Sequence, residues 1–122
     1  MRAKDAVGRY GERLAGIHLE RVGLTVLDRN WRCDLGEVDL VAVDSGCLVV
    51  VEVKTRRSLE YGHPAEAVTA AKQARLRRLA ARWLAERGTG TGQVFGEVRI
   101  DVVAVLWPRT GPAQLQHLRG VC

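Results

Sequence analysis

The sequence contains few aromatic residues, few cysteines and no long apolar run. Phe, Trp and Tyr make up 5% of its 122 residues, which argues against a surface that stacks the bases of single-stranded nucleic acid. The cysteines are far apart and form no C-x-x-C pair, so they favour neither a disulfide framework nor a structural zinc site. They are Cys33, Cys47 and Cys122. Because no apolar run approaches the length of a membrane span, we expect a cytoplasmic protein with no membrane partner.

The remaining composition is that of a basic globular protein. The chain is 47% hydrophobic and long enough for one core, so we expect a single domain over residues 1–122. The formal net charge is +5, and 16 of the 19 basic residues are Arg, whose guanidinium group binds phosphate through two parallel hydrogen bonds. A polyanionic partner is therefore favoured. A GC-rich genome also produces an Arg excess, together with much Ala, Gly and Val, so composition alone does not decide.

Hydrophobic periodicity and turn residues divide the chain into helices and strands. The expected helices cover residues 6–22, ended by Gly23, and 64–86, begun by Pro64. A polar loop of residues 56–63 precedes the second helix. The expected strands cover residues 24–31, 38–43, 47–53 and 98–107, and a weak edge strand covers residues 114–118. The resulting order is helix, three strands, helix and strand, which predicts an α/β protein.

Two of these strands form a hairpin with charges set into apolar runs. A turn at Ser45 and Gly46 places Asp44 opposite Cys47. Counting back along both strands then gives two further pairs, Asp39 with Glu52 and Glu37 with Lys54. Because side chains alternate, these four charged groups share one face. The other face is apolar and consists of Val38, Leu40, Val49, Val51 and Val53.

The charged face of the hairpin needs a counter-charge. Like charges directly opposite each other destabilise a sheet, and a hard divalent cation such as Mg²⁺ is held by one or two carboxylates plus substrate phosphate. Asp39 and Glu52 are therefore candidate metal ligands. Lys54 points to the same side, where an ammonium group can orient a water molecule or neutralise charge on a phosphate. The competing interpretation is a ladder of surface ion pairs on a solvated strand face.

Both helices carry further candidates, each with an ordinary structural alternative. Glu12 borders the apolar arc of the first helix and either reaches toward the sheet or is a solvated glutamate. Lys72 and Gln73 either contact substrate over the end of the sheet or are held by local packing and strand backbone. The residues that either form a phosphate track or a solvated face are Arg75, Arg78 and Arg82. We expect Arg99 and Asp101 to pair, and the three histidines, His18, His63 and His117, to be non-ligands.

Taken together, these motifs resemble the PD-(D/E)xK superfamily of restriction-endonuclease-like nucleases. Within it the chain looks like the small bacterial YraN-type proteins, which are similar to archaeal Holliday-junction resolvases. The resemblance spans nearly the whole chain. The residues that carry it are Gly11-Glu12, Asn30-Trp31-Arg32, Gly36-Glu37-Val38-Asp39-Leu40, Val51-Glu52-Val53-Lys54-Thr55-Arg56, Lys72, Gln73 and Arg99-Ile100-Asp101-Val102. Val38 replaces the proline of the superfamily motif, at a position that contributes backbone shape and no ligand.

The resemblance implies a mixed central sheet flanked by helices and a metal-dependent endonuclease acting on DNA, with branched or structured forms as candidate substrates. It implies that Asp39, Glu52 and Glu12 bind Mg²⁺ or Mn²⁺ and that Lys54 assists the attacking water, with Glu37 in support. The expected nucleic-acid contacts are Lys72, Gln73, Arg75, Arg78, Arg82 and Arg56. Two alternatives stay open: a non-catalytic nucleic-acid-binding or adaptor module on the same fold, and a chain that works only as a homodimer or with a partner.

Overall fold

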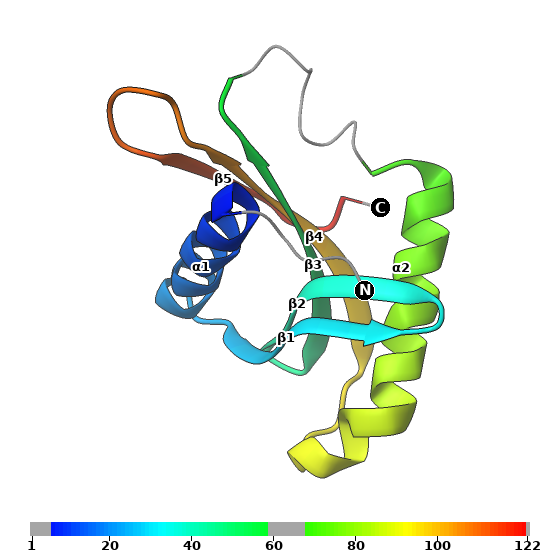
Figure 1. The fold of residues 1–122 in the computed structure, drawn as a ribbon. Helices are drawn as coiled ribbons and strands as arrows, with labels where there is room; N and C mark the ends of the chain where they lie inside the picture. Colours follow the sequence, from blue (N-terminus) through cyan, green and yellow to red (C-terminus); the bar gives the residue numbers. More distant parts are fainter. Residues whose placement is uncertain (1–5, 59–67, 122) are drawn as a thin grey trace.

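The computed structural model describes residues 6–58 and 68–121 and shows two main helices around one sheet (Figure 1). The helical elements are α1 (Ala6–Arg21), α2 (Ala70–Trp83), a π-helical turn η2 (Leu84–Gly88) and a 3₁₀ turn η3 (Thr89–Thr91). The strands are β1 (Thr25–Cys33), β2 (Gly36–Asp44), β3 (Cys47–Arg56), β4 (Glu97–Leu106) and β5 (Gln114–Leu118). None of the described helices has the length and apolar character needed to cross a lipid bilayer.

The five strands form one mixed sheet in the order β1-β2-β3-β4-β5. β1 with β2, β2 with β3, and β4 with β5 are antiparallel, whereas β3 and β4 are parallel. Parallel neighbours need a crossover connection, and α2 lies in the connection between β3 and β4. The predicted α/β class, the helix–strand order and the weak edge strand at residues 114–118 are confirmed.

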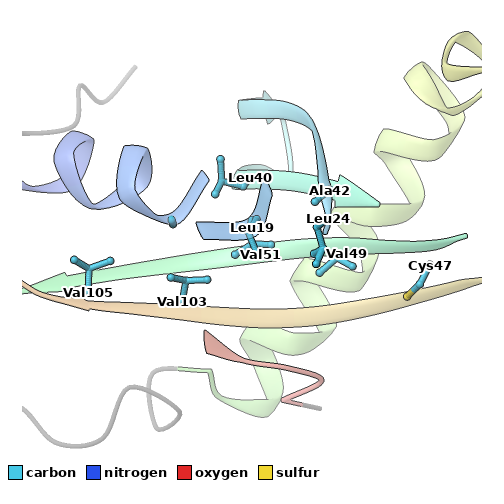
Figure 2. Close-up of a cluster of buried hydrophobic side chains, with 10 residues drawn as sticks. Leu19, Leu24, Leu40, Ala42, Cys47, Val49, Val51, Val103 and Val105 are labelled. Atoms are coloured by element: carbon cyan, nitrogen blue, oxygen red, sulfur yellow. The ribbon is translucent and has the colours of Figure 1, made fainter. Parts of the chain in front are cut away.

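Each face of the sheet buries its own apolar cluster, one under each helix. Figure 2 shows the cluster on the α1 side, where Leu19 lies over Val51. Its buried members are Ala15, Leu19, Leu24, Leu40, Ala42, Cys47, Val49, Val51, Val103 and Val105. The cluster on the α2 side consists of Trp31, Val38, Val41, Leu48, Val50, Leu76, Leu79, Ala80, Trp83 and Ile100. Because β3 is covered on both faces, its first five residues are all buried, which explains its continuous apolar run.

The β2–β3 turn sets the register of the hairpin as predicted. Ser45 and Gly46 have φ of 47° and 82°, the positive values of the two-residue turns that match strand twist. Asp44 lies opposite Cys47, and the ladder continues to Leu40 opposite Val51. There it ends. Beyond this point β2 pairs with β1 as far as Gly36, so the predicted cross-strand pairs of Asp39 with Glu52 and Glu37 with Lys54 are not part of the ladder.

The separation of β2 from β3 also corrects the predicted apolar face. Val38 packs in the α2-side cluster, whereas Leu40 packs on the α1 side. The strict alternation of side chains therefore fails between these two residues. β1 contributes to the distortion, since its register shifts between Val26 and Asp28 and Asn30 has φ of 50°. Such irregularities bend a strand and increase its twist, and β1–β2 turns away from the plane of β3 and β4 (Figure 1).

The second helix begins later than predicted. Thr69 has extended backbone, with φ −72° and ψ 166°, and its side chain accepts a hydrogen bond from the Lys72 N–H at 3.2 Å. This is the N-cap arrangement that starts a helix, so α2 begins at Ala70 and the prediction of Pro64 as the first residue is wrong. Pro64 itself, His63 and most of the predicted loop lie outside the described residues. At the other end the α-helix stops at Trp83 and continues as η2.

A glycine fixes how closely α1 approaches β3. A Cβ built on Gly11 would overlap Oγ1 of Thr55 and lie 2.8 Å from its Cβ. We expect Gly11→Ala to destabilise the protein by about 1–3 kcal/mol, the usual cost of overpacking, because both groups belong to regular elements and neither can yield cheaply. Urea unfolding measures the change. Gly90→Ala is the matched control, since nothing lies within 4 Å of its Cβ position, and an equal loss in both variants would contradict this account.

A buried aspartate joins β4 to the end of the chain. Asp101 is fully buried, and its oxygens accept hydrogen bonds from Nε of Arg99 at 2.8 Å, from Nε2 of His117 at 2.7 Å and from the Gly120 N–H at 2.9 Å. Nδ1 of His117 lies 3.2 Å from Nε2 of His18. The predicted pairing of Arg99 with Asp101 is confirmed. Burial raises the pKa of Asp101, but the hydrogen bonds and the Arg99 charge outweigh it and lower the pKa overall.

Asp101→Asn is expected to destabilise the protein. The new amide NH₂ group would face N–H groups that donated hydrogen bonds to the carboxylate, and two donors cannot bond to each other. Breaking a buried ion pair costs about 3–5 kcal/mol, and Arg99 is partly exposed, so we expect the lower end of this range. The lowered pKa of Asp101 makes its stabilisation complete above about pH 4, its unfolded value, and lost as pH falls through the folded value. Urea unfolding should show a deficit at pH 7 that shrinks in acid. A constant deficit would contradict the assignment, and Glu97→Gln, which changes an exposed carboxylate at the start of β4, is the control.

Candidate functional site

A pocket of about 380 Å³ opens where β2 separates from β3, on the α2 side of the sheet. Side chains from both strands and from the first turns of α2 line it. The lining residues are Gly36, Glu37, Asp39, Glu52, Val53, Lys54, Lys72, Arg75 and Leu76. The structure therefore brings together the two predicted acidic ligands and the predicted lysine, although their strands have stopped pairing. It adds two basic residues of α2: Lys72, which was expected over this end of the sheet, and Arg75, which was expected in the phosphate track.

The side chain of Asp39 connects β2 to β3 beyond the point where their backbone hydrogen bonds end. Its side chain is 5% exposed, and Oδ2 accepts a hydrogen bond from the Val53 N–H at 2.8 Å. This bond fixes the direction of the carboxylate. Asp39 also lines the same pocket as Glu52. Asp39 is thus a positioned, nearly buried carboxylate.

Glu52 is held between a like charge and an opposite charge. Burial raises the pKa of Glu52, and the hydrogen bond and charge of Asp39 raise it further. Lys72 acts in the other direction through an ion pair between its Nζ and Oε2 of Glu52, but it does not outweigh the first two causes. Glu52 therefore lies beside a carboxylate that disfavours its ionised form and an ammonium group that favours it.

Lys54 is a half-buried ammonium group at the same place. Burial lowers the pKa of Lys54, and the charge and hydrogen bond of Lys72 lower it as well. The charges of Glu52 and Asp39 act in the opposite direction without reversing the shift. Titratable groups that are shifted by burial and by specific neighbours are typical of functional sites. The pocket therefore brings the interacting carboxylates of Asp39 and Glu52 together with Lys54 and Lys72.

The two other predicted acidic residues differ in position. Glu37 lines the same pocket as Asp39 and Glu52, and it forms an ion pair with Arg32 at 3.5 Å. Glu12 is 7% exposed and lines a different pocket, between α1 and β1–β2, whose other residues include Leu40. Within residues 6–58 and 68–121, no three His, Cys, Asp or Glu residues are grouped to hold a metal ion. Asp39 and Glu52 are the two carboxylates that could hold Mg²⁺ here, with water and substrate phosphate completing its ligands.

The predicted nucleic-acid contacts lie in different surroundings. Lys72 and Arg75 line the pocket, and Arg78 is exposed on α2. Nε2 of Gln73 donates a hydrogen bond to the carbonyl of Val121, in the segment after β5, at 3.3 Å. Arg82 pairs with Asp34 at 2.7 Å. The remaining residue, Arg56, is half-buried at the end of β3.

Sequence reasoning missed the basic lining of the second pocket. Arg9 and Arg13 lie one helical turn apart on α1, and Arg29 joins them from β1. The four-residue spacing of the first two was a readable signal. The position of Arg29 was not readable, because it depends on how β1–β2 turns toward α1.

The fold and the pocket define a mixed α/β protein with a carboxylate–lysine site at a point where two strands separate. Residues 11–105 match the Uncharacterised protein family UPF0102, and the chain belongs to this family. The matched range includes every residue of the pocket. A UPF0102 protein of Beutenbergia cavernae is 65% identical over 121 residues, with 99% of each chain covered. Others, from Kineococcus radiotolerans and Streptomyces coelicolor, are 59% and 53% identical over 99% of this chain and 97% and 92% of their own.

Proposed function

We propose that the chain is a metal-dependent endonuclease that hydrolyses DNA phosphodiester bonds, built as one restriction-endonuclease-like domain over residues 1–122. Branched or structured DNA is a candidate substrate. One observation carries the proposal: Asp39, Glu52 and Lys54 line a single pocket at the end of a broken strand pair. A purely structural ladder of ion pairs has no need to bury two carboxylates together, since like charges at this spacing destabilise the fold.

In this proposal Asp39 and Glu52 hold Mg²⁺ or Mn²⁺. The bound cation would polarise the scissile phosphate and lower the pKa of a bound water molecule. The residues of the chain supply the rest. Asp39 is oriented by its bond to the Val53 N–H. Lys54 holds its ammonium group beside the carboxylates, where it orients water and offsets charge on the phosphate.

Lys72 has a second role in the proposed site. It pairs with Glu52 in the described structure, so it neutralises part of the acidic charge before a cation enters. With Glu52 holding the cation, the ammonium group of Lys72 would contact the substrate phosphate instead. Arg75 lies on the same side of α2 and lines the pocket. The two basic residues therefore belong to substrate binding and the carboxylates to metal binding.

The test is a cleavage assay across linear, flapped, four-way and RNA substrates. The purified protein is incubated with Mg²⁺ or Mn²⁺ and, in parallel, with a chelator. Metal-dependent cleavage of at least one DNA substrate supports the proposal. Binding without cleavage under every condition would instead favour the non-catalytic binding or adaptor module. Size-exclusion chromatography with light scattering on the same preparation shows whether the active species is a monomer or a homodimer.

The exposed arginines of α2 give a separate prediction for binding. Arg75→Ala with Arg78→Ala should weaken DNA binding and make its salt dependence shallower by about 2 in the logarithmic slope, since each lost phosphate contact removes about 0.9. Arg82→Ala is the matched control, because its guanidinium group is paired with Asp34. Fluorescence anisotropy over a salt series measures the slope. A slope unchanged in the double variant would mean that this side of α2 is only a solvated face.

A further inference from the structure

The pocket between α1 and β1–β2 is an arginine-lined groove outside the site described so far. It has a volume of about 490 Å³. Its lining residues are Arg9, Glu12, Arg13, Ile17, Arg29, Asn30 and Leu40. Three guanidinium groups thus surround one carboxylate, and that carboxylate, Glu12, is 7% exposed. The accessible charge of the groove is therefore positive.

The α1 wall of the groove has a regular pattern. Arg9, Arg13, Ile17 and Arg21 follow one another at four-residue intervals, and all four are exposed. Residues at this spacing lie on one side of a helix and rise about 6 Å per step. From Ala6 to Arg21, the part of α1 that the structure describes, no acidic residue occupies a position in this row. The helix therefore presents a basic stripe with one apolar side chain, Ile17, which is 48% exposed.

The third arginine is positioned across the helix by a glycine. A Cβ built on Gly16 would lie 2.5 Å from Nη1 and 3.0 Å from Nη2 of Arg29. The guanidinium group of Arg29 therefore rests in the space that a side chain at position 16 would fill. The next residue, Asn30, has φ of 50°, a left-handed conformation that Asn adopts more readily than most residues. The groove thus has a held guanidinium group on its β1 wall and a basic stripe on its α1 wall.

The groove lies directly behind the proposed catalytic pocket. Leu40 lines the groove, and the preceding residue, Asp39, lines the catalytic pocket. The two pockets are therefore on opposite sides of β2 at the same level, and β1–β2 lies between α1 and α2 (Figure 1). A nucleic acid that contacts both pockets would therefore pass around β1–β2.

From these observations we infer that the groove of Arg9, Arg13 and Arg29 is a second contact surface for the phosphodiester backbone of a nucleic acid. The inference rests on the proposed function in taking the polyanion to be DNA. Arginine suits this role because its planar fork binds phosphate oxygens bidentately. The scarcity of aromatic residues favours backbone contacts over base stacking. The groove would hold a flanking segment while the acidic pair acts on the scissile phosphate.

The test compares binding by two double variants with the same change in charge. Arg13→Ala with Arg29→Ala removes two groove arginines, whereas Arg87→Ala with Arg109→Ala removes two exposed arginines outside it. Fluorescence anisotropy with linear duplex and four-way DNA is measured in chelator over a salt series. We expect the groove variant to bind at least about tenfold more weakly and to lose about 2 from the logarithmic salt slope. The outside variant should change little.

A third variant tests position without changing charge. Gly16→Ala should weaken binding partially, because the new methyl group displaces the Arg29 guanidinium. The melting temperature of Gly16→Ala is also measured, so that weaker binding caused by displacement of Arg29 is distinguished from unfolding of the variant. Equal weakening in the two double variants, or no DNA binding by the wild type, would overturn the inference. If DNA binding depends on the groove arginines but no DNA is cleaved, the proposed nuclease activity is refuted and the groove remains a binding surface. If DNA is cleaved but the groove variant binds as the wild type does, only the inferred role of the groove is refuted.

Discussion

Lys54→Ala is expected to lower the rate of metal-dependent DNA cleavage by about 10²–10⁴-fold, the usual contribution of a positioned acid, base or electrostatic group. The metal ligands remain in this variant, since Asp39 and Glu52 are untouched. The loss should therefore appear in the single-turnover rate at saturating Mg²⁺, with little change in the metal concentration that gives half the maximal rate. This combination separates a group that acts on water or phosphate from one that holds the cation.

The control for Lys54→Ala is Arg109→Ala, which removes a basic group far from the pocket in the chain and exposed at the surface. It should cleave as the wild type does. Glu52→Gln provides the opposite pattern, because the loss of a ligand weakens metal binding as well as the rate. If Lys54→Ala cleaves at the wild-type rate, Lys54 has no role in the proposed chemistry. That result would not test the roles of Asp39 and Glu52.

Asp39→Asn is expected to stabilise the metal-free protein slightly while abolishing its response to metal. An Asn side chain can still accept the Val53 N–H through its carbonyl oxygen, so the link between β2 and β3 persists. The substitution removes the like charge that raises the pKa of Glu52. We expect a gain of a few tenths to about 1 kcal/mol, the size of one cross-strand pair. A structural ion-pair ladder would instead lose stability.

The response to metal is measured through the stabilisation that a bound cation gives to the folded protein. A cation that binds the folded site and scarcely the unfolded chain stabilises the wild type by about 2.7 kcal/mol at a hundred times its dissociation constant. Thermal melting with chelator, Mg²⁺ or Mn²⁺ should show this rise in the wild type and none in Asp39→Asn. The melts are repeated with DNA, because a substrate phosphate is the expected additional ligand. Equal metal shifts in both proteins under both conditions would contradict a cation on Asp39, and Asp34→Asn is the control.

Local patterns were sufficient to predict most of the fold. The strand and helix order, the turn at Ser45 and Gly46, and the register as far as Leu40 follow from apolar alternation and turn residues. The predicted start of α2 was wrong. Proline is compatible with the first position of a helix but does not require a helix to begin there, whereas the Thr69 side chain accepts an N-cap hydrogen bond from the Lys72 N–H. The predicted sheet face of Val38 was wrong because strict alternation of side chains requires a regular ladder. The ladder between β2 and β3 ends at Leu40.

The site was predictable in its composition but not in its geometry. Spacing along two strands was enough to group Asp39, Glu52 and Lys54, because they lie near one another in a simple hairpin. Glu12 was placed with them by resemblance, yet in the structure it lines the opposite pocket. Contacts between distant parts of the chain, such as Arg29 over Gly16 or His18 beside His117, depend on the twist of β1–β2 and on packing. No short-range pattern encodes them.

The most direct test of the central claim compares the wild type with Asp39→Asn on the DNA substrate that the wild type cleaves best. Both proteins are prepared identically, and circular dichroism establishes that the variant is folded. The proposed site predicts cleavage by the wild type in Mg²⁺ or Mn²⁺, no cleavage in chelator, and no cleavage by Asp39→Asn under any of these conditions. Metal-dependent cleavage by a clean preparation of Asp39→Asn at the wild-type rate would contradict it.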